Sequence, residues 1–239
     1  MARIAIIGYG KMGKTIEKIA LERGNTVPVI IDAHNAGDLL TTTLEQVDVA
    51  IEFTRPESAF NNITTLIKNK VPVVCGTTGW LEKRAEVEKL TLDNNTAFFY
   101  ASNYSVGVNL FFHLNKKLAQ MINPFNEYNV EMEEIHHIHK LDAPSGTAIT
   151  LAEGIIDNID RKKAWELDQE SSDDKINIKH VREGEVPGTH SITYNSPIDS
   201  IEIKHTAHNR QGFAQGAVLA AEFLAGKKGL FGMDDLLKL

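Results

Sequence analysis

The feature that most constrains the fold is a glycine-rich turn between an apolar run and a helix near the start of the chain. Residues 2–7 are mostly β-branched and apolar, the turn at 8–13 reads G-Y-G-K-M-G, and residues 15–23 have helical character. A second apolar run at 27–31 ends in Asp32, about 20 residues further on, where dinucleotide-binding folds place the acid that holds the ribose hydroxyls. The glycine pattern alone is also typical of a plain turn. Strand, turn, helix, strand and acid together predict dinucleotide binding.

Strands and helices continue to alternate through the rest of the first half. Strands are predicted at 48–53, 71–75 and 96–101, and helices at 56–68 and 81–92. This alternation favours an α/β fold with a parallel sheet, whose strands have carboxyl ends that line the ligand crevice. An ordinary polar loop is the alternative at any single strand end, but three suitable ends indicate cofactor contact. The candidate cofactor-binding residues are Gly8, Tyr9, Gly10, Lys11, Met12, Gly13, Asp32, Phe53, Thr54, Gly76, Thr77, Thr78, Ala101, Ser102, Asn103 and Tyr104.

A second architecture is predicted after residue 104. A helix at 105–121 leads out of the nucleotide-binding part, and the polar stretch at 157–175 is interpreted as a helix end and a solvated loop. The other runs have the alternation and the flanking glycine and proline turns of strands. They predict one mixed sheet, an α+β arrangement, with strands at 127–138, 176–182, 189–194 and 200–208.

The last helix, predicted at 212–225, carries a long apolar face, and we expect the chain to return and pack it on the first domain. The predicted organisation is a dinucleotide-binding domain at 1–104 plus 212–239, and a substrate-binding and oligomerisation domain at 105–211. Hinge motion between the domains would close the site over a substrate. One chain has few helices to cover the mixed sheet, so pairing between subunits is expected to make a homo-oligomer.

The densest polar motif is E-I-H-H-I-H-K-L-D-A-P-S-G-T at 134–147, which ends a predicted strand and precedes a predicted helix at 148–159. Three of the nine histidines of the chain lie within it. Asp142 or Ser145 can cap the helix, and Gly146 allows a ligand to approach closely. Backbone N–H groups at such a helix start favour an anion.

This corner has the groups to bind carboxylates and to transfer a proton. The candidate catalytic residues are His136 and Lys140, because imidazole titrates near neutral pH and an ammonium group stabilises negative charge. The residues alone do not decide which of the two is the proton donor. The candidate substrate-binding residues are His137, Ser145, Gly146 and Thr147.

Clustered histidines are also typical of metal sites, and His136, His137 and His139 offer enough nitrogens. Neighbouring residues of a strand point to opposite faces, however, so His136 and His137 do not face one ion without a kink. Ordinary surface histidines are the other alternative, and the helix start that favours an anion nearby argues against it. We therefore expect a catalytic corner and no metal.

Composition and charge exclude several classes of function. The 239 residues carry 25 Lys and Arg against 32 Asp and Glu, a net charge of −7, without a basic block. This balance argues against binding to nucleic acid or to an anionic membrane. Cys75 is the only cysteine, which excludes an intrachain disulfide and indicates a reducing compartment. The apolar start of the chain is too short for a signal peptide or a membrane span, so we expect a cytoplasmic protein.

Taken together, these motifs resemble the 4-hydroxy-tetrahydrodipicolinate reductase (dihydrodipicolinate reductase) family. The resemblance rests on the 134–148 segment, supported by G-Y-G-K-M-G, C-G-T-T-G-W, Y-A-S-N-Y-S-V-G-V-N and V-R-E-G-E-V-P-G-T-H, and it spans nearly the whole chain. It implies a Rossmann-like domain completed by the C-terminus, a mixed-sheet domain and a homotetramer. It also implies that His136 is the catalytic acid or base, that Lys140 is the proton donor, and that His137 and the 146–147 pair bind substrate.

The reaction implied by this resemblance is hydride transfer from a reduced nicotinamide to an unsaturated cyclic imine with two carboxylates, in lysine and diaminopimelate biosynthesis. The chain departs from some relatives in its glycine turn, which is one residue shorter, and in Ala33, which replaces an arginine. Asp32 favours free ribose hydroxyls and Ala33 cannot pair with a 2′-phosphate. We therefore expect NADH to be preferred, with NADPH possible through Lys11 or His34.

Two other functions are compatible with parts of the sequence. One is another NAD(P)-dependent dehydrogenase of a small amino-dicarboxylate, such as aspartate or its semialdehyde. The other is a non-catalytic nucleotide sensor, in which the histidine and lysine corner would be idle. Loss of NADH absorbance in the presence of the cyclic dicarboxylate separates the three.

Overall fold

The chain divides into two compact units. The computed structural model describes residues 1–40, 44–169, 172–209 and 211–239. Unit 1 comprises Met1–Val106 and Gln211–Leu239, and unit 2 comprises Gly107–Arg210. Among the described residues, none of the helices combines the length and apolar character that a membrane crossing needs.

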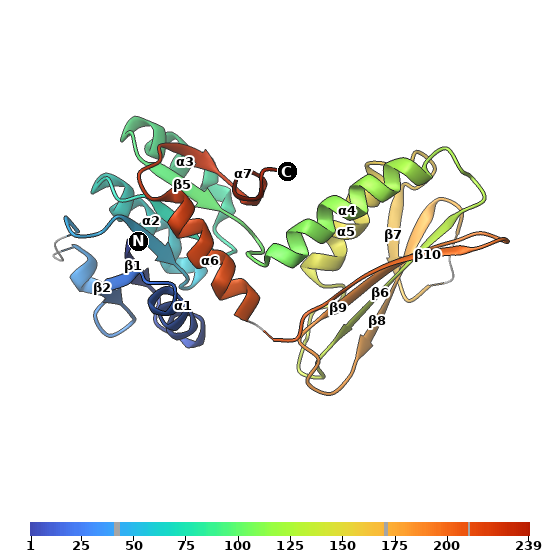
Figure 1. Cartoon of the computed structure of the whole chain (residues 1–239), viewed down its shortest axis with the longest axis horizontal. Helices are drawn as coiled ribbons and strands as arrows, with labels where there is room; N and C mark the ends of the chain where they lie inside the picture. The colour runs from blue at the N-terminus through green and yellow to red at the C-terminus, as the bar shows by residue number, and fades with distance from the viewer. Residues whose placement is uncertain (41–43, 170–171, 210) are drawn as a thin grey trace. The chain divides into compact units, whose positions relative to one another are not determined.

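Unit 1 is built on a parallel sheet of six strands in the order β11-β5-β4-β3-β1-β2 (Figure 1). Its inner strands are buried on both faces, which explains why they read in the sequence as continuous apolar runs and not as alternating ones. The predicted α/β class is confirmed. The strands are β1 (Arg3–Ile7), β2 (Thr26–Ile31), β3 (Val49–Glu52), β4 (Val73–Cys75), β5 (Ala97–Tyr100) and β11 (Gly229–Phe231).

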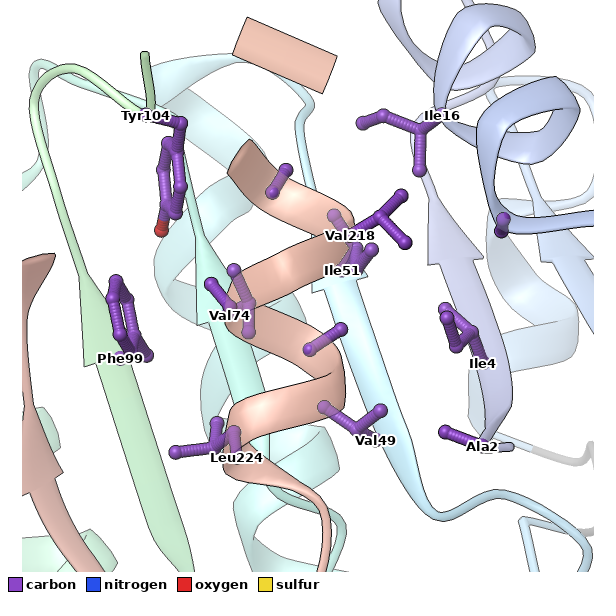
Figure 2. Close-up of a cluster of buried hydrophobic side chains, with 14 of the residues drawn as sticks. Ala2, Ile4, Ile16, Val49, Ile51, Val74, Phe99, Tyr104, Val218 and Leu224 are labelled. Atoms are coloured by element: carbon purple, nitrogen blue, oxygen red, sulfur yellow. The ribbon is translucent and has the colours of Figure 1, made fainter. Parts of the chain in front are cut away.

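Helices cover both faces of this sheet. On one face the buried core includes Val218 and Leu224 of α6, which point at Ile51, Val74 and Phe99 of the strands (Figure 2). On the other face Ile63, Leu66 and Ile67 of α2 form a second core. The α-helices are α1 (Lys11–Glu22), α2 (Pro56–Lys68), α3 (Arg84–Asp93), α6 (Gln211–Leu224) and α7 (Met233–Leu237), with 3₁₀ turns at Ala36–Leu40 and Leu81–Lys83.

The C-terminal segment adds two elements that the sequence pattern did not predict. Strand β11 extends the sheet by pairing with β5 through Leu230 and Phe98, and α7 buries Met233 in the same core as α6. Both elements are very short, so their periodicity is too weak to be recognised in a sequence.

Unit 2 contains the predicted mixed sheet, in the order β10-β9-β6-β8-β7. Strand β6 pairs in parallel with β8 and antiparallel with β9. Helices α4 (Val106–Ile122) and α5 (Gly146–Ile156) share one apolar core with this sheet. The strands are β6 (Asn129–His136), β7 (Ala164–Leu167), β8 (Lys175–Arg182), β9 (Thr189–Asn195) and β10 (Ser200–Thr206).

One prediction for this unit needs correction. The stretch at 157–175 is not only a helix end and loop, because it contains strand β7, which pairs in parallel with β8 and packs Trp165 and Leu167 on the core. The sheet face opposite the helices carries the polar cross-strand set Glu131, Glu133, Lys179, Ser191 and Thr193 together with the apolar pair Ile135 and Val181. Pairing of this sheet with a second subunit stays a prediction.

Candidate active site

A pocket of about 530 Å³ lies at the carboxyl ends of β1, β2 and β3 in unit 1. This is the edge at which open parallel sheets bind their ligands. Six of the residues predicted to contact the cofactor line it, together with eight others. The lining residues are Ile7, Gly8, Tyr9, Gly10, Ile31, Asp32, Ala33, His34, Ala36, Phe53, Thr54, Arg55, Ser58 and Asn62.

Each of the three glycines of the turn has a different structural role. Gly8 has φ +101°, and a Cβ there would lie 2.0 Å from the carbonyl oxygen of Phe53. A Cβ on Gly13 would lie 2.1 Å from the carbonyl oxygen of Gly8, so this glycine lets α1 pack closely on the strand. Gly10 has open space in front of it. A tight turn, an open approach and a close helix contact are the roles of the three glycines in a pyrophosphate-binding turn.

Asp32 follows β2 and is held by a local turn. Its Oδ1 accepts hydrogen bonds from the backbone N–H of His34 at 2.7 Å and of Asn35 at 3.3 Å. Asn35 in turn accepts from the N–H of Asp32 at 2.6 Å. The turn fixes the direction of the carboxyl group at the rim of the pocket, where an acid would receive the hydroxyls of a ribose.

The remaining predicted cofactor residues lie around the same sheet edge without lining the pocket. Lys11 and Met12 begin α1, and Thr77, between Gly76 and Thr78, accepts a hydrogen bond from the N–H of Thr54 at 2.8 Å. Ala101 and Tyr104 are buried in the core.

Tyr104 donates its hydroxyl to the carbonyl oxygen of Cys75 at 2.7 Å, so its side chain is structural. Asn103 accepts from the N–H of Ser105 at 2.9 Å, while Ser102 is exposed. Arg55 is the chief lining residue that the sequence reasoning missed. Its signal was available, because it directly follows the strand-end pair at 53–54.

In unit 2, the predicted corner forms where β6 ends and α5 begins. His136 is the last residue of β6 and is buried, with a side chain only 9% exposed. Ser145 is the N-cap of α5, since its hydroxyl accepts a hydrogen bond from the N–H of Ala148 at 3.1 Å. Of the two predicted caps it is Ser145, and not Asp142, that caps, and the helix begins at Gly146, two residues earlier than predicted.

The start of α5 is accessible to a ligand. Gly146 is exposed, and a Cβ placed on it would meet nothing within 4 Å. The first N–H groups of a helix have no partner within the helix, so those of Gly146 and Thr147 are available to an anion. The hydroxyl of Ser145 is engaged by the cap and by the imidazole Nε2 of His190, 3.1 Å away, and its role in binding substrate stays a prediction.

Lys140 lies just before this helix start. Its Nζ donates to both carboxylate oxygens of Asp142 at 2.7 Å, and its side chain is 19% exposed. The hydrogen bond from Lys140 lowers the pKa of the Asp142 carboxyl. Of the other two histidines of the motif, His137 is half-buried, and His139 is exposed and pairs with Glu185 at 3.1 Å.

Glu134 is a fully buried carboxylate beneath this corner, and the sequence reasoning did not single it out. Its Oε2 accepts from the N–H of Ser145 at 3.0 Å, and its Oε1 lies 3.3 Å from the Nη2 of Arg182. The imidazoles of His136 and His190 lie 3.7 and 3.8 Å from Oε2. Burial raises the pKa of Glu134, but hydrogen bonds from Ser145 and the attraction of the charge that His136 and His190 carry when protonated outweigh burial, so the pKa is lowered.

The two buried imidazoles are held in their neutral form. Burial lowers the pKa of His136, and the charges of Lys140 and Arg182 lower it further, while Glu134 opposes them. Burial, aided by the charge of His136, lowers the pKa of His190 to about 4. At neutral pH the positive charge of the corner therefore resides on Lys140 and Arg182.

Glu134, His136 and His190 also place one potential ligand atom each within 4.8 Å of one another, the spacing of a metal site. The contacts of Glu134 argue against a metal here. Its carboxylate oxygens already receive the N–H of Ser145 and the guanidinium of Arg182. A cation at this point would compete with that guanidinium charge, so a corner without a metal stays our expectation.

A pocket beside a glycine turn with Asp32 at its edge in one unit, and a corner of acid-base and anion-binding groups in the other, are features typical of a nicotinamide-dependent oxidoreductase.

Comparison with known proteins makes the assignment specific. Residues 2–104 match the family described as "Dihydrodipicolinate reductase, N-terminus", and residues 107–237 match "Dihydrodipicolinate reductase, C-terminus". The 4-hydroxy-tetrahydrodipicolinate reductase of Christiangramia forsetii is 50% identical over 98% of this chain and 97% of its own. The chain belongs to the dihydrodipicolinate reductase family, so it is an oxidoreductase of lysine and diaminopimelate biosynthesis.

Solved structures agree with this assignment. The dipicolinate-bound dihydrodipicolinate reductase from Paenisporosarcina sp. TG-14 has 25% identity and a TM-score of 0.77, over 98% of this chain and 99% of its own. An aspartate dehydrogenase from Thermotoga maritima has 14% identity and a TM-score of 0.51, over 95% of this chain and 98% of its own, a likeness of fold alone. The alternative of an amino-dicarboxylate dehydrogenase thus shares the architecture and not the family.

Proposed function

We propose that the corner at 136–147 binds the two carboxylates of the cyclic imine and delivers the proton that completes its reduction. The observation that carries this proposal is the accessible start of α5 at Gly146, in the same segment as the Lys140 ammonium and the buried His136. Helix N–H groups and a cation are the groups that hold a carboxylate. Fixing one carboxylate orients the ring carbon that accepts hydride.

The structure favours Lys140 over His136 as the proton donor. When bound, the reduced nicotinamide supplies the hydride. Negative charge then develops in the conjugated ring, and an ammonium group beside it stabilises that charge and provides the proton. Burial lowers the pKa of His136, so its imidazole is neutral at neutral pH and suits a role as acceptor or orienting group. His137, Gly146 and Thr147 complete the proposed carboxylate site.

The pocket of unit 1 suits the nucleotide, and we expect NADH to be preferred over NADPH. Asp32 at the rim favours free ribose hydroxyls, and Ala33 offers no charge to a 2′-phosphate. His34 and Arg55 line the same pocket and are the residues through which NADPH would be tolerated. A hundredfold higher kcat/KM with NADPH would contradict the preference.

Two further properties complete the proposal, the first implied by the family resemblance and the second by the residues themselves. A homotetramer is one, and sedimentation analysis of the purified protein tests it. A cytoplasmic location is the other, and the single, buried Cys75 suits a reducing compartment. Hydride transfer also requires the nicotinamide and the ring to approach within about 3–3.5 Å, so we expect the two units to close on each other during the reaction.

The decisive assay mixes the protein with NADH and enzymatically generated substrate and follows the loss of NADH absorbance. Dipicolinate, which is bound in the Paenisporosarcina structure, is a stable probe of the carboxylate site. We expect turnover that dipicolinate inhibits in competition with the cyclic substrate. A protein that binds NADH and does not turn over would contradict the proposal and favour a nucleotide sensor.

A further inference from the structure

We propose that Glu134 and Arg182 form a positioning pair that fixes the 140–145 loop at both ends and thereby places Lys140 and the start of α5 for the substrate. This inference rests on the proposed role of the corner and extends it to the buried Glu134 and the partly buried Arg182. Neither residue needs to touch the substrate. Their role is to hold the groups that do.

The contacts of Arg182 secure the first part of the loop. Its Nη2 donates to the carbonyl oxygen of Asp142 at 2.7 Å, and its Nε donates to that of Lys140 at 3.3 Å. The same Nη2 lies 3.3 Å from Oε1 of Glu134. A planar guanidinium can make these contacts in fixed directions, which a lysine could not reproduce.

The contacts of Glu134 secure the end of the loop. Its Oε2 accepts from the backbone N–H of Ser145, the cap of α5. The loop that carries Lys140 is thus attached to one carboxylate at residue 145 and, through Arg182, at residues 140 and 142. Sheet pairing makes this possible, because β6 and β8 run parallel and place Glu134 and Arg182 on adjacent strands.

The pair also sets the electrostatic surroundings of His136. Glu134 faces it from the same strand, Arg182 from β8 and His190 from β9, while His137 and Lys140 follow in the loop. Of these groups only Glu134 raises the pKa of His136. Neutralising Glu134 should therefore move the titration of His136 to lower pH, which a purely structural role would not predict.

The experiment compares E134Q with the matched control E133Q. Glu133 is the preceding residue of β6, with its side chain on the opposite face beside Lys179 at 3.2 Å. We expect E134Q to weaken dipicolinate binding, measured by calorimetry, at least about tenfold while the Kd of NADH changes less than about twofold, since a hydrogen bond to a charged group is worth about 1.5–3 kcal/mol. We expect E133Q to leave both Kd values unchanged.

The titration of His136 is followed by NMR in protein labelled at its histidines, with H136N to assign the signal. E134Q should shift this titration to lower pH, and E133Q should not. An E134Q protein that binds dipicolinate like the wild type, with His136 titrating unchanged, overturns the inference. A lower Tm as the only effect of E134Q also overturns it.

Removing one member of a buried ion pair can prevent folding, because the other charge is left unpaired. The double variant E134Q/R182Q removes both charges. R182K keeps the positive charge but loses the planar guanidinium and its fixed donor directions. We expect weakened dipicolinate binding in whichever of these variants folds, and wild-type binding overturns the inference. K140A separates the two proposals: if K140A retains full activity, the proposed function fails, whereas normal E134Q with impaired K140A refutes only the positioning pair.

Discussion

Two buried glutamates show how differently the two units treat the same side chain. Glu52 ends β3 in unit 1 and Glu134 lies near the end of β6 in unit 2, and both are completely buried. Glu52 receives hydrogen bonds from the hydroxyl of Thr54 and from the thiol of Cys75 at 3.3 Å, and burial raises its pKa. Glu134 has Arg182 and two imidazoles around it, and its pKa is lowered.

This difference shows that the partners, and not burial alone, decide the charge of an interior carboxyl group. At Glu52 the hydrogen bonds from Thr54 and Cys75 do not offset the cost of desolvation, so its pKa is raised. At Glu134 the hydrogen bonds from Ser145, together with the attraction of His136 and His190, outweigh burial, so its pKa is lowered. The two units therefore bury the same side chain with opposite effects on its pKa.

The largest expected effect tests whether the corner at 136–147 in unit 2 delivers the proton. Lys140→Ala removes the proposed proton donor, so kcat should fall about 10²–10⁴-fold, while the Kd of NADH stays nearly unchanged because the nucleotide pocket is untouched. Steady-state kinetics and calorimetry with NADH measure the two quantities. Lys163→Ala, an exposed lysine of the same unit, is the control and should leave both unchanged.

The second prediction concerns acid stability. His190 has a pKa of about 4 when folded and an ordinary value when unfolded, so the unfolded state binds the proton first as the pH falls. Stability should therefore decrease between about pH 6.5 and pH 4, by up to about 3 kcal/mol from this residue. Denaturant titrations at several pH values check this.

His190→Gln should flatten that part of the stability profile, whereas substitution of the exposed His34 should not. An unchanged profile in His190→Gln would show that other groups, such as His205, dominate the acid response.

A third prediction tests the pocket of unit 1 through the binding of NADH. Asp32→Ala removes the acid at the pocket rim, and the Kd of NADH should rise about tenfold, equivalent to about 1.4 kcal/mol. The Kd of dipicolinate, which belongs to the other unit, should stay the same. Asp93→Ala, an exposed acid at the end of α3, serves as the control. Equal weakening of both ligands would mean that Asp32 acts on the fold and not on the ribose.

The smallest expected effect compares the glutamates directly. Glu52→Gln replaces a carboxyl group whose pKa is raised by burial with a neutral group of the same shape, so stability should change by less than about 1 kcal/mol. Because the folded-state pKa of Glu52 is raised, the wild type loses stability as the pH rises above the unfolded pKa, and the variant should lose less. Chemical denaturation at pH 5 and pH 8 measures this. Strong destabilisation by Glu52→Gln at pH 8 would remove the contrast with Glu134.

The sequence was sufficient to predict the glycine turn and sheet edge of unit 1, but only part of the corner at 134–147 in unit 2. The glycine turn, the sheet edge and Asp32 are local patterns, because a turn and a strand end each depend on neighbours in the chain. Glu134, Arg182 and His190 come from three strands, and their meeting depends on the register of β6 with β8 and β9. No local pattern contains that register.

Within the corner, the residue types and the presence of a helix start were predictable from the sequence. The contacts that each side chain makes were not. Ser145 was predicted as a cap or a substrate-binding residue, and its hydroxyl caps α5 and also contacts His190, a partner that the sequence pattern did not indicate. Strand β7 was missed because Trp165 and Leu167 are isolated apolar residues within a polar stretch, and only the adjacent β8 gives them a sheet to join.

The discontinuity of unit 1 has a consequence for how the protein is made. Helix α6 supplies much of one core, and strand β11 completes the sheet, yet both lie in the last 29 residues, Gln211–Leu239. During synthesis unit 2 leaves the ribosome whole, while unit 1 must wait until residues 211–239 have been made. A chain truncated before residue 211 would therefore lack α6 and β11, however intact unit 2 is.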